Sequence, residues 1–211
     1  MTVKDALAEL VAQVGDNLVV FSHDESSLWM SEWSGVRLER TRVRNAPQGL
    51  TASITDAGAL AVLEDGERRV LGLVTVNSNS RIVCRMIDRD PAAVIDEAWF
   101  ATRLQRALAL RETLFDAPYY RLVHAEADGL PGVVIDRFGD AAVIQPNAAW
   151  SETLIGPLSA ALAKVTGVTT IIRNGMGRAR ALEGLPEELT VLQGAIDAPV
   201  PVPMNGAIYM A

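Results

Sequence analysis

One stretch of the sequence concentrates side chains that could do chemistry. Residues 119–140, YYRLVHAEADGLPGVVIDRFGD, contain the titratable residues His124, Glu126, Asp128 and Asp136. A histidine with several carboxylates could bind a metal ion or transfer protons. However, Asp128 falls in a predicted glycine-rich turn and Asp136 lies beyond it, while the only other histidine, His23, is distant in the sequence. The pattern favours two strands joined by a tight turn and predicts no metal site and no catalytic residue.

A second candidate is the segment 174–184, NGMGRARALEG, which follows a predicted strand. Gly175 and Gly177 invite comparison with the G-x-G-x-x-G loop that binds dinucleotide phosphates. The third glycine is absent, because position 180 is an arginine. The segment is therefore predicted to be an arginine-bearing surface loop, in which Arg178 and Arg180 could meet an RNA phosphate.

Several arginines also lie on one predicted strand. In GVRLERTRVR, residues 35–44, apolar residues alternate with the four basic residues Arg37, Arg40, Arg42 and Arg44. This period indicates a half-buried strand, and its basic face is either an RNA contact or an ordinary solvated surface. The net charge of −7 argues against a generic nucleic-acid-binding protein. However, seventeen of the nineteen basic residues are arginines, and they are concentrated in the middle of the chain. Arginine is the residue best suited to binding phosphate through two hydrogen bonds.

The elements that must position these residues fall into two patterns. Residues 36–88 contain four or five short predicted strands, with a hairpin turn at Asp65-Gly66, which suggests a small antiparallel barrel or sheet. From Asp96 the period changes to that of a helix ending before Pro118, followed by the hairpin, a further strand, a helix near 150–165 and another strand. The second half is therefore predicted to be an α+β layer.

The remaining composition restricts the class of protein. No apolar run approaches the roughly 20 residues of a membrane helix, no signal peptide is evident, and the cytoplasm is the expected location. Cys84 is the only cysteine, so an intrachain disulfide and a cysteine-based zinc site are excluded, and it is predicted to be buried in a strand. The apolar end AIYMA, after an Asn205-Gly206 turn, suggests a hairpin cut in the middle, so the chain is interpreted as a fragment.

Three motifs resemble a known enzyme family: VNSNSRIVCRMIDRDP, IDEAWFATRLQRALALRETLF and above all YRLVHAEADGLPGVVIDRFGD, within about residues 60–192. They are similar to the front part of bacterial class I S-adenosylmethionine-dependent rRNA (cytosine-C5) methyltransferases. Members of that family have a PUA domain, a middle domain and a C-terminal catalytic domain. The resemblance implies that the cofactor loop and the catalytic cysteine lie downstream of residue 211. It therefore implies no cofactor in this chain itself, and Cys84 lies in the wrong region to replace that cysteine.

The resulting fold prediction is α+β: a small PUA-like antiparallel β-barrel, complete or degenerate, followed by an α+β middle domain with a mixed sheet and two helices. The predicted divisions are a divergent N-terminal segment, PUA-like strands, the middle domain and the start of a truncated hairpin, at 1–50, 51–90, 91–195 and 196–211.

The leading functional hypothesis is an RNA-positioning portion of an rRNA methyltransferase, with rRNA as partner. One alternative is a non-enzymatic interaction or homodimerisation module that does not bind RNA, in which an acidic amphipathic helix at 2–14 could dock a partner. A small hydrolase using His124 is the third.

Overall fold

The computed structural model describes residues 18–21, 38–41, 57–64, 69–77, 80, 84–204 and 206–210. The chain divides into two compact units. The first comprises residues 1–94 together with 182–184, and the second comprises 95–181 with 185–211. The predicted helix at 2–14 and the Asp65-Gly66 turn lie outside the described residues.

The described part of the first unit consists of two small antiparallel sheets. β1 (Leu18–Phe21) pairs with β2 (Leu38–Thr41). β3 (Ala59–Glu64), β4 (Val70–Val76) and β5 (Cys84–Asp88) form a three-stranded sheet in that order. Its core includes Cys84, buried as expected, and burial raises the pKa of that thiol to about 12. The predicted strands are confirmed, whereas closure into a PUA-like barrel stays a prediction.

The second unit opens with an 18-residue helix, α2 (Glu97–Leu114). The side chain of Asp96 caps it by accepting a hydrogen bond from the backbone N–H of Trp99 at 2.9 Å. Phe100, Leu104 and Ala107 are buried at i, i+4 and i+7, as the sequence period predicts.

A five-stranded mixed sheet follows. It contains β6 (Tyr119–His124), β7 (Val133–Phe138), β8 (Ala141–Pro146), β9 (Thr170–Asn174) and β10 (Leu189–Gln193). The spatial order is β10-β9-β8-β7-β6, with β8 and β9 parallel and the other neighbours antiparallel. The mixed sheet is confirmed, although β10 was not predicted.

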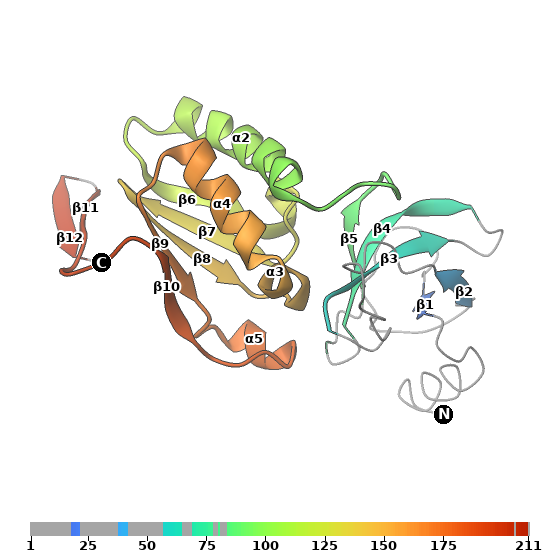
Figure 1. Cartoon of the computed structure of the whole chain (residues 1–211). Helices are drawn as coiled ribbons and strands as arrows, with labels where there is room; N and C mark the ends of the chain where they lie inside the picture. The colour runs from blue at the N-terminus through green and yellow to red at the C-terminus, as the bar shows by residue number, and fades with distance from the viewer. Residues whose placement is uncertain are drawn as a thin grey trace. The chain divides into compact units, whose positions relative to one another are not determined.

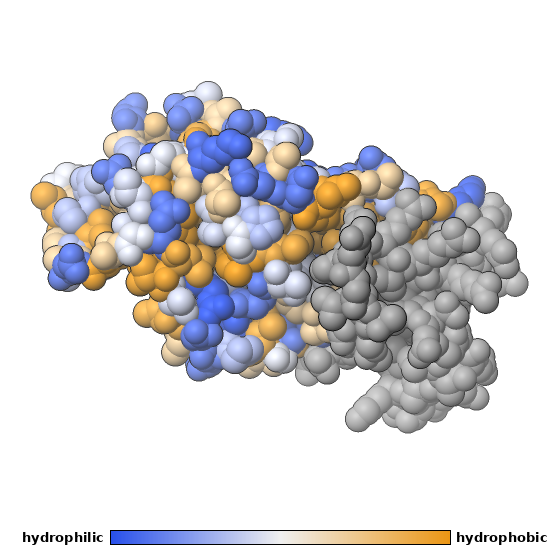
Figure 2. Space-filling model, viewed as in Figure 1, coloured by the Kyte–Doolittle hydropathy of each residue, from blue (hydrophilic) through white to orange (hydrophobic). Residues whose placement is uncertain are grey.

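Helices cover one face of this sheet. α2 and α4 (Ile155–Thr166) lie across β6 to β8, as Figure 1 shows, and α3 (Ala149–Thr153) precedes α4. With α5 (Arg178–Leu182), whose last residue belongs to the first unit, the described residues form four α-helices. The prediction of two is therefore corrected: α3 and α5 are only five residues long and have no detectable period. The residues exposed over α2 are mainly hydrophilic (Figure 2).

The register of the sheet separates its two faces. Ile135 of β7 pairs with Ile144 of β8, and both are fully buried on the helix-covered face. Phe138 lies three residues after Ile135, and its partner Ala141 lies three residues before Ile144. Because successive side chains alternate between faces, Phe138 and Ala141 point to the opposite face, where they are only partly buried. One face therefore forms the core, while the other remains partly accessible.

The last described elements form a small hairpin. β11 (Pro201–Met204) pairs with β12 (Ala207–Met210) throughout, from Pro201↔Met210 to Met204↔Ala207. The apolar end is therefore a paired strand, and its partner strand, residues 201–204, was not predicted because its two prolines hide a strand signal. The interpretation of the chain as a fragment stays a prediction. Among the described helices, none is long and apolar enough to cross a membrane.

Candidate functional site

Asp128, a candidate catalytic acid in the sequence, stabilises the β6–β7 hairpin by hydrogen bonds. Arg111 on α2 donates two hydrogen bonds to its carboxylate, at 2.6 and 2.7 Å, and the backbone N–H of His124 donates a third at 2.7 Å. Burial alone would raise the pKa of Asp128, but these hydrogen bonds and the positive charge of Arg111 outweigh it and hold the pKa below its ordinary value. The carboxylate is thus committed to structure, which confirms the hairpin interpretation.

The other titratable residues of the hairpin do not converge. Arg121 binds Asp136 at 2.9 Å, a hydrogen bond that raises the pKa of the guanidinium, and the side chain of His124 is exposed. A bulge between Arg121 and Val123 interrupts the alternation of side chains along β6, so that Leu122 and Val123 are both buried. Among the described residues, no group of three or more His, Cys, Asp or Glu side chains could hold a metal ion.

The glycine-rich segment after β9 is shaped by close contacts rather than by a ligand. A Cβ at Gly175 would lie 2.6 Å from the backbone oxygen of Glu188 and 3.0 Å from the Nε of Arg180. A Cβ at Gly177 would lie 3.2 Å from the Oδ1 of Asn147. The glycines are therefore explained by packing against neighbouring backbone and side chains.

Arg180 lies inside the second unit, so the expectation that its side chain is exposed is wrong: its relative exposure is 0%. It donates to the backbone oxygens of Pro146 at 2.6 Å and Pro186 at 2.8 and 3.1 Å, and to the carboxylate of Glu152 at 2.7 Å. The guanidinium joins the end of β8, α3 and the loop before β10. In this position it has no surface for contacting RNA.

A second arginine shares the same carboxylate. Arg173 on β9 also pairs with Glu152, and its other end-nitrogen contacts Thr190 at 3.0 Å and the carboxylate of Glu188. Hydrogen bonds from Thr190 and Arg173 lower the pKa of Glu188. Sequence analysis missed this network because Glu152 stands 21 and 28 residues from its two arginines, at no spacing that a motif could reveal.

The remaining predicted RNA contacts are only partly described. Arg178, the first residue of α5, is exposed. Arg37, Arg42 and Arg44 lie outside the described residues, and of Arg40 only the backbone, within β2, is described. Their proposed role remains a prediction.

The first unit contains a buried carboxylate of its own, that of Glu183, which is 3% exposed. Its Oε2 accepts a hydrogen bond from Asn77 at 2.8 Å, and its Oε1 accepts one from Ser80 at 2.6 Å. Arg85 contacts the same Oε1 at 3.1 Å and balances the charge. A buried carboxylate with this many donors is stable without a ligand.

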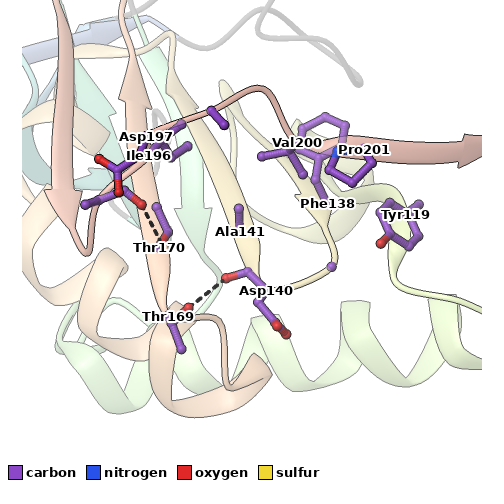
Figure 3. Close-up of a pocket in the computed structure, with 13 residues that line it drawn as sticks. Tyr119, Phe138, Asp140, Ala141, Thr169, Thr170, Ile196, Asp197, Val200 and Pro201 are labelled. Atoms are coloured by element: carbon purple, nitrogen blue, oxygen red, sulfur yellow. Dashed lines mark hydrogen bonds between the residues drawn. The ribbon is translucent and has the colours of Figure 1, made fainter. Parts of the chain in front are cut away.

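A hollow of about 350 Å³ lies at the less covered face of the second unit's sheet. Its floor comes from the ends of β6 to β9, and its roof is the segment 195–201 between β10 and the β11–β12 hairpin. Figure 3 shows Phe138 next to Val200 and Pro201, with Asp197 at the other end of the hollow. This site could not be predicted from the sequence, because its residues come from segments up to 82 positions apart.

Comparison with known proteins gives one consistent likeness. The chain is 37% identical over 153 residues to the ribosomal RNA large subunit methyltransferase I of Shewanella amazonensis, and 32% identical over 126 residues to a ribosomal RNA large subunit methyltransferase of Deinococcus radiodurans. The chain resembles rRNA methyltransferases. These alignments cover 69% and 56% of the chain but only 37% and 31% of the relatives, so the chain spans about a third of their length.

The structural comparison agrees at the level of fold. A protein of Streptococcus mutans, assigned as a SAM-dependent methyltransferase, matches with a TM-score of 0.62 over 73% of this chain and 40% of that one. The sequence identity is 16%, so this likeness establishes a shared fold alone. No protein-family model matches the chain.

Proposed function

We propose that this chain is the RNA-recognition and positioning portion of a SAM-dependent rRNA (cytosine-C5) methyltransferase. The observation that carries the proposal is the 37% identity to a ribosomal RNA methyltransferase over 153 residues. Methyl transfer itself is assigned to the part of such enzymes that the chain does not cover. The first unit takes the role of the PUA-like domain, and the second that of the middle domain.

In this proposal exposed arginines contact the RNA backbone. Arg178 is the described member of the predicted set with an exposed side chain, whereas Arg180 supports the same segment from inside. Because each arginine–phosphate contact releases about one counterion, binding weakens steeply as salt rises.

The test is fluorescence anisotropy of the chain with fragments of large-subunit rRNA between 50 and 200 mM salt. Affinity is expected to fall with salt, and Arg178→Gln is expected to weaken binding and reduce the salt slope by about 1. Arg106→Gln removes an arginine of α2 that is also exposed and serves as the matched control. S-adenosylmethionine, titrated separately by calorimetry, is expected not to bind. Absence of RNA binding at low salt, or micromolar cofactor binding, would contradict the proposal.

Exposed apolar residues favour a second candidate, an interaction module. On the β11–β12 hairpin Ile208 is 72% exposed and Met210 63%, and Leu189 on the edge strand β10 is 64% exposed. A two-stranded hairpin is marginally stable by itself, so a partner surface would stabilise it. Analytical ultracentrifugation separates the two candidates, because self-association through apolar surface persists at high salt.

A further inference from the structure

The floor of the hollow is one row of side chains across four strands. In the register of the sheet Tyr119 pairs with Phe138, Phe138 with Ala141, and Ala141 with Thr170. Paired residues point to the same face, so two aromatic rings and two small side chains stand side by side away from the core. The small side chain of Ala141 leaves space between the rings and the far wall, as Figure 3 shows.

The size of the hollow suits a small ligand. Its volume of about 350 Å³ falls in the range of about 300–1,000 Å³ of ligand pockets. Segment 195–201 closes it above the sheet, with Val200 and Pro201 opposite Phe138. A flat ring system entering here would meet an aromatic face at one end and polar groups at the other.

The side chains of Thr169, Thr170 and Asp197, which line the part of the hollow away from Tyr119, are hydrogen-bond acceptors. The hydroxyl of Thr169 donates to the backbone oxygen of Asp140, and that of Thr170 to the backbone oxygen of Ala195, each at 3.4 Å. Their remaining capacity is therefore to accept. Asp197 adds an exposed carboxylate, whereas the carboxylate of Asp140 extends away from segment 195–201 in Figure 3. The residues lining the hollow include no Lys, Arg or His.

An acceptor-rich, negatively charged wall beside aromatic rings excludes phosphate and selects a flat ligand that donates hydrogen bonds. We propose that the hollow binds an unpaired guanine base of RNA. The ring stacks at Tyr119 and Phe138, and the carboxylate of Asp197 accepts from its N1–H and N2 amino group. Guanine presents these two donors side by side on its pairing edge, whereas uracil presents a single imino group there. This inference rests on the proposed RNA recognition and gives it a base-specific site.

The test compares pentaribonucleotides that differ at one base. The whole chain is titrated by anisotropy with labelled UUGUU, UUUUU and the inosine analogue, which keeps N1–H but lacks the amino group. UUGUU is expected to bind about tenfold more tightly than UUUUU, with inosine between them. The ratio is expected to stay constant as salt changes, because the base contacts release no counterions. Equal affinity for the three oligonucleotides would overturn the inference.

Two variants locate the binding. Asp197→Asn is expected to abolish the preference for guanine, while Asp116→Asn, which makes the same change at an exposed position outside the hollow, leaves it intact. Tyr119→Leu is expected to weaken all three oligonucleotides by at least about fivefold through loss of stacking. Retention of the guanine preference in Asp197→Asn would show that the base binds elsewhere and would overturn the inference.

The outcomes distinguish this inference from the proposed function. Salt-dependent binding of rRNA fragments without a guanine preference would overturn the guanine site and leave the proposed function standing. A guanine preference without binding of rRNA fragments would support the site and contradict the proposed function.

Discussion

Replacement of Glu152 by glutamine is expected to destabilise the second unit strongly. This carboxylate is the anionic partner of both Arg173 and Arg180, and Arg180 is completely buried. Glutamine keeps the shape but leaves the charge of Arg180 with only the backbone oxygens of Pro146 and Pro186 as partners. Removing one partner of a buried ion pair costs about 3–5 kcal/mol. Arg173 retains Glu188, so the low end, about 3 kcal/mol, is expected.

Trp150 provides a probe for this measurement, because it is buried on α3 two residues before Glu152. Urea unfolding followed by tryptophan fluorescence gives the free energy of unfolding, and the midpoint temperature should fall by about 12 °C for a unit of this size. Glu187→Gln, at an exposed site before β10, should change stability by less than about 0.5 kcal/mol. A loss below about 1 kcal/mol for Glu152→Gln would show that the charge of Arg180 is solvated, and would refute the reasoning.

Three further outcomes follow from the same unit. The folded-state pKa of Asp128 lies below its unfolded value, so its stabilisation is present above about pH 4 and is lost as pH falls through the folded pKa. Acid unfolding of Asp128→Asn should therefore be shallower than that of the wild type, and an unchanged slope would contradict this. Gly175→Ala should lower the free energy of unfolding, measured by urea denaturation, by about 1–3 kcal/mol, because the new Cβ would lie 2.6 Å from the backbone oxygen of Glu188. Gly156→Ala is the control, because a Cβ at that position would meet open space. Trp150→Phe should lower the free energy of unfolding by about 1–2 kcal/mol, because the indole N–H no longer donates its 2.8 Å hydrogen bond to the backbone oxygen of Pro131. Thermal unfolding measures this loss, and a neutral effect would show that water replaces the indole N–H as donor.

Local patterns predicted the elements that depend on local chemistry. The helix beginning at Asp96 has a cap and a 3.6-residue period, and the hairpin of 119–138 has glycines where the chain turns, Gly129 and Gly132 both having positive φ. Both elements appear as expected. Such signals lie within a few residues of each other, so the sequence displays them directly.

The features that were missed depend on contacts between distant segments. β10 pairs with β9 because the chain returns after α5. Its five residues, LTVLQ, have a strand-like composition, but the strand is short, largely exposed and adjacent to the predicted arginine-bearing loop, so it was overlooked. Arg180 looked like a surface residue because the three groups that surround it, at positions 146, 152 and 186, cannot be associated with it from sequence spacing. The hollow beneath residues 195–201 was missed for the same reason.

The membership of Glu183 in the first unit has a consequence for synthesis on the ribosome. The carboxylate that accepts hydrogen bonds from Asn77 and Ser80 is made about ninety residues after the last strand of that unit, β5. At about 5–20 residues per second, the donors wait roughly 5–20 s for their acceptor to be synthesised. Until then the first unit lacks the hydrogen bonds and the ion pair that Glu183 supplies, so its final stability is acquired only after most of the second unit has left the ribosome. Folding of the two units is thus coupled in time by three residues.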